Sequence, residues 1–176
     1  GGATWKIVDK ESDRAKFYPF SYNNIWKANA TQILHSTDMG QTWSFSMARD
    51  MSFKPLDNLV YFIDPIHGWI LQDGIQATKD GGKTWTKQAV DFQPDQLFFV
   101  NENNGWAVAQ NSAISKTTDG GNTWIRIKPN LFIREMTDVF FMDENKGWLI
   151  GGGFIYNTTD GGQNWNAVNV LDIVYR

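Results

Sequence analysis

The sequence predicts an all-β protein, specifically a β-propeller of four-stranded antiparallel blades with four complete blades and part-blades at both ends. The first observation behind this prediction is a period near 40 residues in the positions of all nine tryptophans. The second is that the same short motifs flank the tryptophans. The third is that apolar runs are short and rich in aromatic and β-branched residues, without helical periodicity. A solenoid is the structural alternative, but its repeats are usually shorter and contain fewer strands.

The tryptophans form two interleaved series, and neighbours within each series are 37–43 residues apart. The first series is Trp5, Trp43, Trp85, Trp124 and Trp165, and the second is Trp26, Trp69, Trp106 and Trp148. Each member of the second series follows a glycine, except that Ile25 precedes Trp26. We expect this second series to pack between neighbouring blades.

Each repeat contains the pattern of four strands. Inner strands are predicted at 59–64, 97–101 and 139–143, because continuous apolar runs of this length suit strands buried on both faces. A polar turn and a Gly-Trp strand follow, then a third strand, and then a fourth strand that starts at the first-series tryptophan. Proline then interrupts the chain before the next inner strand, at Pro55, Pro94 and Pro129. The predicted blades cover about 17–48, 56–90, 95–129 and 136–169.

The turn before each fourth strand contains a recurrent box. The boxes read STDMGQTW (36–43), TKDGGKTW (78–85), TTDGGNTW (117–124) and TTDGGQNW (158–165). A short carboxylate there can accept hydrogen bonds from the N–H groups of its own turn, a glycine permits positive φ, and the indole packs against neighbouring strands. We therefore expect a structural set and no catalytic cluster. The set comprises Asp38, Asp80, Asp119, Asp160, Gly40, Gly82, Gly121, Gly162, Trp43, Trp85, Trp124 and Trp165.

This box resembles the Asp-box, or BNR repeat, of sialidases, BNR-type glycoside hydrolases and sortilin-like receptors. Its combination with Gly-Trp in one repeat most resembles the photosystem II assembly/stability factor family and its bacterial relatives. The resemblance covers nearly the whole chain, and it is specific for the fold but weakly specific for function. Two departures are Met39 in place of a glycine and Asn164 in place of a threonine. Pro19 lies within the first inner strand, so we expect the first blade to be less regular.

The two ends of the sequence fit part-blades. Trp5 is in phase with the boxes, which predicts an outer strand at 4–10 from a preceding blade, and 170–176 resembles the start of a further strand. The sequence therefore suggests a piece of a larger propeller of about 6–8 blades. A closed ring of four or five blades is the alternative. An open arc would expose sheet edges and faces, so oligomerisation is also expected.

Composition excludes several classes of function. The net charge of -3 and the lack of a Lys/Arg run argue against nucleic acid as the partner. The 176 residues suffice for one domain with a sizeable core. No apolar run approaches the ~18 residues of a membrane span, so direct membrane insertion is not expected. With no cysteine and no pair of histidines at ligand spacing, we expect neither a metal site nor a cofactor.

Candidate catalytic groups do not converge in the sequence. A sialidase would need Tyr156 to act as nucleophile beside Glu135, but nothing in their spacing brings them together. A glycoside hydrolase needs two opposed carboxylates. The candidates occupy equivalent turns of successive repeats, which favours a structural or solvated role: Asp64, Glu102, Asp143 and Glu144. His35 and His67 are the only histidines, predicted on a third strand and in a turn respectively.

One basic surface emerges from the predicted topology. Arg14, Arg49 and Arg134 all precede inner strands, on the side opposite the boxes, whereas Arg126 lies on an outer strand. Three arginines on one rim can bind an anion or an acidic protein. The alternative is that they are simply solvated. The family resemblance favours the binding surface, because it implies a basic face for partner binding.

The function expected is a non-catalytic propeller scaffold, a protein-binding or assembly module outside the cytoplasm (periplasmic, lumenal or secreted). Its expected partners are proteins, either the remaining blades or a membrane-protein complex. The alternative is part of a carbohydrate-active or sugar-binding propeller of the sialidase or glycoside hydrolase kind.

Overall fold

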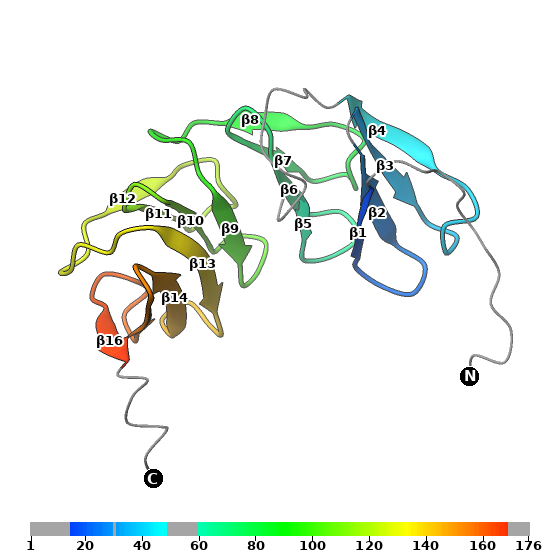
Figure 1. The fold of residues 1–176 in the computed structure, drawn as a ribbon. Coiled ribbons are helices and arrows are strands. Elements are labelled where there is room, and N and C mark those ends of the chain that lie inside the picture. The colour runs from blue at the N-terminus through cyan, green and yellow to red at the C-terminus, as the bar shows by residue number, and fades with distance from the viewer. Residues whose placement is uncertain (1–14, 30, 49–59, 169–176) are drawn as a thin grey trace, which may run out of the picture. The chain divides into compact units, whose positions relative to one another are not determined.

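The structure, a computed structural model, describes residues 15–29, 31–48 and 60–168. Every regular element in these ranges is a β-strand, and the strands form four sheets of four strands each (Figure 1). The predicted strand at 4–10, the segment 170–176, Arg14, Arg49 and Pro55 lie outside the described residues. The prediction of four complete antiparallel four-stranded blades is confirmed.

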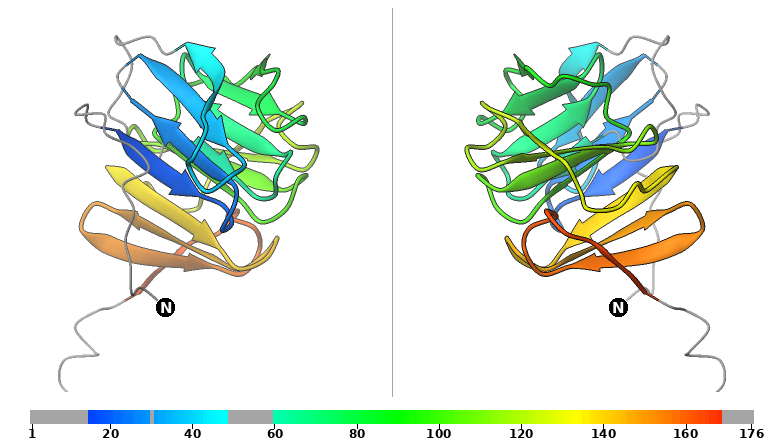
Figure 2. Two further views of the ribbon diagram at one scale, coloured as in Figure 1. Left: turned by 90° about the vertical axis from the view of Figure 1, so that its right-hand side faces the viewer. Right: turned by 90° about the vertical axis from the view of Figure 1, so that its left-hand side faces the viewer.

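Each sheet contains four strands that are consecutive along the chain. The first contains β1 (Lys16–Pro19), β2 (Ile25–Ala28), β3 (Gln32–Ser36) and β4 (Ser44–Ala48). The second contains β5 (Val60–Phe62), β6 (Gly68–Leu71), β7 (Ile75–Thr78) and β8 (Thr86–Gln88). The third contains β9 (Gln96–Phe99), β10 (Gly105–Ala109), β11 (Ala113–Thr117) and β12 (Ile125–Ile127). The fourth contains β13 (Met136–Phe141), β14 (Gly147–Gly151), β15 (Phe154–Thr158) and β16 (Asn166–Val168), and Figure 2 shows it in yellow to red.

The chain forms two compact units, residues 1–72 with 78–85 and residues 73–77 with 86–176. The first unit contains the whole first sheet, and the second unit contains the whole third and fourth sheets. In the second unit, a cluster of buried residues joins these two sheets, with Trp106 and Val108 on one side and Val139, Phe141 and Leu149 on the other. The hydrophobic core of this unit therefore lies between consecutive sheets.

The Gly-Trp pairs have a packing explanation. In the second, third and fourth sheets, the glycine pairs across the strands with an inner-strand phenylalanine, as in Phe99↔Gly105. A Cβ on Gly105 would lie 2.4 Å from the Phe99 ring, so only glycine leaves room for that ring. In the first sheet the pair is Pro19↔Ile25. Proline takes the place of the phenylalanine in this pair, and isoleucine takes the place of the glycine.

Two tryptophans of the second series stack on the inner-strand phenylalanine of the next sheet. Trp26 stacks on Phe62 within the first unit, with ring centroids 4.1 Å apart. Trp106 stacks on Phe141 within the second unit, with centroids 3.5 Å apart and planes 6° apart. Contact between two large rings buries apolar surface, and aromatic pairs add about 0.5–1.5 kcal/mol to that burial. These stacks are the central contacts between successive sheets.

Two expectations about burial need correction. The prediction that inner strands are buried on both faces is wrong for β13, where Thr137, Asp138 and Phe140 are exposed. One face of this strand packs on the third sheet, and the opposite face is uncovered. The box tryptophans were expected to bury their rings, but only Trp165 is fully buried, whereas Trp43, Trp85 and Trp124 are half-buried.

Candidate functional site

The box turns are closed by hydrogen bonds from their own side chains. In the second box, the Thr78 hydroxyl donates to Asp80 Oδ1 at 2.8 Å and accepts from the Gly82 N–H at 2.8 Å. The same carboxylate accepts from the Thr84 N–H at 2.9 Å and from the Thr84 hydroxyl at 2.6 Å. Equivalent bonds form in the other three boxes, around Asp38, Asp119 and Asp160. Both oxygens of each aspartate therefore bind the turn that carries it.

The two departures from the box pattern have different consequences. Asn164 replaces threonine without loss, because its amide Nδ2 donates to Asp160 Oδ2 at 2.7 Å. Met39 has φ of 62°, in the left-handed region that favours glycine. Its N–H bond to the Asn23 carbonyl is 3.5 Å long, against 2.8 Å for the equivalent bond of Gly120. A Cβ at Gly120 would lie 2.7 Å from a carbonyl oxygen, so the Met39 side chain accounts for the longer contact.

The box carboxylates stay ionised at neutral pH. Hydrogen bonds from the Thr42 side chain and backbone lower the pKa of Asp38 to about 2, and those from Thr84 lower the pKa of Asp80 to about 2. Hydrogen bonds from Thr123 lower the pKa of Asp119. For Asp160, burial acts to raise the pKa, but hydrogen bonds from Asn164 outweigh it and the net shift is downward. A general acid needs a shift in the opposite direction.

The aspartates in the first turns of the second and fourth sheets also bind their own backbone. Asp64 Oδ1 accepts from the His67 N–H at 2.7 Å, and Asp143 Oδ1 accepts from the Lys146 N–H at 2.8 Å. Glu144 accepts from the Asn104 side chain at 3.0 Å, while Glu102 is exposed at the same kind of turn. Within the described residues, no group of three potential metal-binding side chains occurs.

The remaining candidates lie apart from one another. Tyr156 packs against the core of the second unit, while Glu135 is exposed in the connection before β13. His35 stacks on Trp26, and burial lowers the pKa of its imidazole. Arg134 is exposed and lies over the Phe132 ring at 5.4 Å. The basic rim of Arg14, Arg49 and Arg134 stays a prediction, since its first two members lie outside the described residues.

A polar clasp links the outer strand of one sheet to the box of the next. Ser46 donates to the Gly82 carbonyl at 2.6 Å and accepts from Trp85 Nε1 at 3.0 Å. In the second unit, Gln88 Nε2 donates to the Gly120 carbonyl at 3.0 Å, and Gln88 Oε1 accepts from Trp124 Nε1 at 3.3 Å. Both residues lie three positions after a box tryptophan.

The third copy of this clasp is missing. The residue three positions after Trp124 is Ile127, and its side chain lies 3.5 Å from the place a Cβ on Gly162 would occupy. Among the described residues, the fully buried Trp165 has no hydrogen-bond partner for its Nε1. A cleft of about 580 Å³ opens beside Ile127, between the outer strands of the third sheet and the fourth box.

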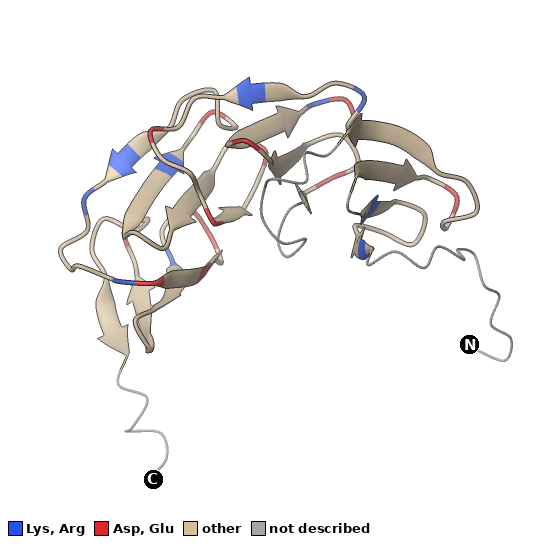
Figure 3. Cartoon of the chain, turned by 45° about the horizontal axis from the view of Figure 1, so that its top comes forward, with Lys and Arg blue, Asp and Glu red and all other residues tan. Residues whose placement is uncertain are grey.

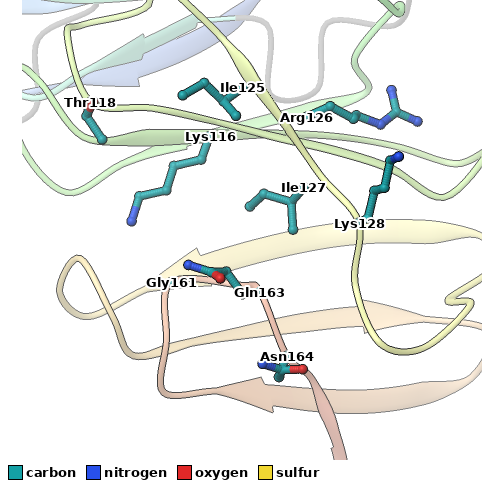
Figure 4. A pocket seen from close by; sticks show the side chains of 9 residues that line it. All are labelled: Lys116, Thr118, Ile125, Arg126, Ile127, Lys128, Gly161, Gln163 and Asn164. Carbon is teal, nitrogen blue, oxygen red and sulfur yellow. The ribbon is translucent and has the colours of Figure 1, made fainter.

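Three basic side chains line this cleft (Figure 4). Lys116 comes from β11, Arg126 from β12, and Lys128 directly follows β12. The opposite wall is polar and comes from the fourth box, with Gln163 and Asn164. Elsewhere, acidic residues lie mainly at turns and strand ends, as Figure 3 shows in red. The cleft is thus a local basic site on a chain whose net charge is -3.

Lys116 and Arg126 are held in place by their neighbours. Lys116 Nζ donates to the Glu144 carbonyl at 3.0 Å and lies 4.9 Å from the Trp106 ring centroid. Burial lowers the pKa of Lys116, and the charge of Glu144 opposes that shift. Arg126 lies over the Phe92 ring at 4.9 Å, and its 3.5 Å contact with the exposed Asp91 is a weak ion pair.

The cleft was not predicted from the sequence. Arg126 was predicted on an outer strand, which is a poor place for a central site, and Lys116 and Lys128 were not predicted as site residues. One signal was present: the residue before the box is a lysine only in the third repeat, at Lys116, and is His35, Ala77 and Asn157 in the others. Such a signal cannot be interpreted without knowing which side chains face the next box.

The family model and the sequence relatives point to one family. The family model described as "Photosynthesis system II assembly factor YCF48" matches residues 46–167. Photosystem II assembly lipoprotein Ycf48 of Synechococcus sp. (strain CC9902) is 30% identical over 129 residues, which cover 65% of this chain and 36% of that protein. Photosystem II stability/assembly factor HCF136, chloroplastic, of Oryza sativa subsp. japonica is 29% identical over 115 residues, covering 59% and 28%. The chain thus spans about a third of the length of these relatives.

A solved structure supports the fold. The structure described as "YCF48 bound to D1 peptide" superposes with a TM-score of 0.61 at 20% identity, covering 93% of this chain and 60% of that one. At this identity the likeness establishes the fold alone. The four sheets are therefore blades of a β-propeller, as the sequence predicted.

Proposed function

We propose, from the premise that the chain belongs to the photosystem II assembly factor YCF48 family, that it is a non-catalytic module that binds a segment of a membrane-protein partner during assembly. The match to residues 46–167 is the observation that carries this proposal. One related solved structure, that of YCF48, is described as bound to a D1 peptide. Relatives described as a lipoprotein and as chloroplastic support a compartment outside the cytoplasm.

The basic cleft supports an acidic peptide segment as the bound group. Arg126 and Lys128 are exposed and bring positive charge to its lining, while Gln163 and Asn164 offer amide donors and acceptors on the facing wall. Guanidinium and ammonium groups bind carboxylates by charge-assisted hydrogen bonds. Among the described residues, no candidate membrane-spanning helix occurs.

Fluorescence anisotropy with overlapping labelled peptides that span D1 tests this proposal. We expect one acidic peptide to bind and the double variant Arg126→Gln/Lys128→Gln to weaken it about tenfold at low salt, since each lost charge removes a favourable long-range interaction. The variant Lys79→Gln/Lys83→Gln removes the same charge from exposed positions of the second box and serves as the matched control. No binding by any peptide would contradict the proposed partner.

A triple variant separates the two basic surfaces. This variant changes Arg14, Arg49 and Arg134 together to Ala. If it abolishes peptide binding while its melting temperature stays unchanged, the peptide binds on the arginine rim. Glycosidase activity above background, lost in Asp143→Asn, would overturn the non-catalytic assignment.

A further inference from the structure

The connection between β12 and β13 holds two apolar side chains in contact with water. Phe132 is 73% exposed and its neighbour Leu131 is 38% exposed, whereas the next residue, Ile133, is buried in the core of the second unit. On the other side, Asn130 is fixed, because its Oδ1 accepts from the Trp165 N–H at 2.8 Å. The two exposed side chains therefore lie between two anchored residues, which keep them at the surface.

The equivalent connection of the preceding blade covers its aromatic ring. Residues 89–95 join β8 to β9, and there Phe92 is half-buried, with the Arg126 guanidinium 4.9 Å from its ring centroid. Phe132 also has a cation over its ring, Arg134 at 5.4 Å, yet most of its surface remains in water. Neighbouring exposed apolar side chains of this kind indicate an interaction surface when they border a hollow.

Leu131 and Phe132 do border a hollow, with a volume of about 440 Å³. We call it the Phe132 hollow; its lining comprises Asn111, Ser112 and residues 126–132. Three of these residues, 126–128, also line the basic cleft, so the two hollows adjoin at β12. As far as the described residues go, the lining of the Phe132 hollow contains no acidic side chain.

The position of β12 allows one bound segment to occupy both hollows. This strand lies at the edge of the third sheet, beside β11, so an extended segment can run along it. Lys128 is exposed and borders both hollows, and its ammonium group can bind a carboxylate by a charge-assisted hydrogen bond. An extended chain spans at most about 11 Å between positions such as Lys128 and Leu131, three residues apart.

We infer that the segment bound in the basic cleft carries a large apolar side chain about three or four residues from its acidic side chain, and that this apolar group packs on Leu131 and Phe132. The inference rests on the proposed function, because it concerns the same bound segment. A segment with acidic groups alone would leave the Phe132 ring in water. A segment with apolar groups alone would leave the charge of Lys128 without a partner.

Two pairs of fluorescently labelled synthetic peptides test this inference without any D1 sequence. In each pair, one peptide contains two aspartates and a Phe-Leu dipeptide, separated by a Gly-Ser spacer of about three residues, and the other contains Ser-Ser in place of Phe-Leu. The Phe-Leu dipeptide follows the aspartates in one pair and precedes them in the other, so that both chain directions are covered. By anisotropy, we expect the Phe-Leu peptide of one pair to bind about tenfold more tightly than its Ser-Ser partner, because apolar surface is buried.

Two variants locate the preference on the protein. Leu131→Ser/Phe132→Ser should remove it and leave the affinity for the Ser-Ser peptide unchanged, whereas Arg126→Gln/Lys128→Gln should weaken both peptides of the pair. Phe45→Ser is the matched control, since Phe45 is 64% exposed on β4 of the first unit, and it should keep the preference. Both replaced side chains of the first variant are exposed, so an unchanged melting temperature is expected and verifies its folding.

Four results would overturn the inference. They are equal affinity within both pairs, no binding by any of the four peptides, a preference that persists in Leu131→Ser/Phe132→Ser, and binding to vesicles of anionic phospholipid that this variant loses. The last result would assign the two side chains to a membrane surface. A Phe-Leu preference that the variant removes supports the inference even when no D1 peptide binds, in which case only the partner named under the proposed function is wrong.

Discussion

Single substitutions can remove the polar clasp where it is present, at Gln88, and add one where it is missing, at Ile127. Gln88→Ile removes the acceptor for Trp124 Nε1, which lies 3.3 Å from Gln88 Oε1, and so recreates the situation of Trp165. A buried donor left without its partner costs about 1–3 kcal/mol. Because the Trp124 ring is half-buried, we expect a loss of about 1–2 kcal/mol in the free energy of unfolding. Ile127→Gln should give the reverse effect, a gain of about 1 kcal/mol, by supplying an acceptor to Trp165 Nε1.

Equilibrium urea unfolding, followed by tryptophan fluorescence and far-UV circular dichroism, measures both changes. For a chain of this length, 1 kcal/mol corresponds to about 2–4 °C in melting temperature, so the two variants should differ by roughly 4–12 °C. Ile127→Leu is the control, since it changes shape without adding a polar group. If Gln88→Ile stays within about 0.3 kcal/mol of the parent, or Ile127→Gln is as unstable as Gln88→Ile, the clasp does not stabilise the joint.

Three further predictions concern the boxes. Met39→Gly should stabilise the protein by about 1 kcal/mol, because glycine adopts a φ of 62° without strain; calorimetry showing a lower melting temperature would contradict this. Thr117→Val should cost about 2 kcal/mol, because the buried hydroxyl accepts from the Gly121 N–H at 2.8 Å, whereas Thr117→Ser should keep most of the stability in the same urea experiment. The folded-state pKa of about 2 at Asp38 and Asp80 lies below the ordinary 3.8, so their contribution is present above pH 4 and lost as the pH falls toward 2. Acid titration of Asp80→Asn should show a shallower loss in that window, and an unchanged profile would refute the assignment.

Much of the fold was predictable because its signals are local. The box hydrogen bonds join residues no more than four positions apart, such as Thr78 with Gly82, so the turn can be inferred from eight consecutive residues. The four strands of each sheet are likewise consecutive, and their period follows from the tryptophans. The replacement of glycine by Ile25 was visible, but its cause, the pairing with Pro19, required the register of the strands.

The candidate site was much less predictable. Lys116, Arg126 and Lys128 line one cleft with Asn164 only because the outer strand of one blade lies near the box of the next. The missing clasp at Ile127 is recognised only by comparison with Gln88, the equivalent residue of the preceding blade, which forms the clasp. Neither relation can be read from one repeat alone.

The amino-acid sequence by itself determined the repeating blade, its four strands and the turns that its aspartates close, because these depend on bonds between residues near one another in the chain. Only the tertiary structure decided which of two equivalent tryptophans is covered, Trp106 or Trp148, and where basic side chains gather. Burial and charge depend on neighbours about 35–40 residues away in the chain, and the identity of a residue does not specify what will pack against it.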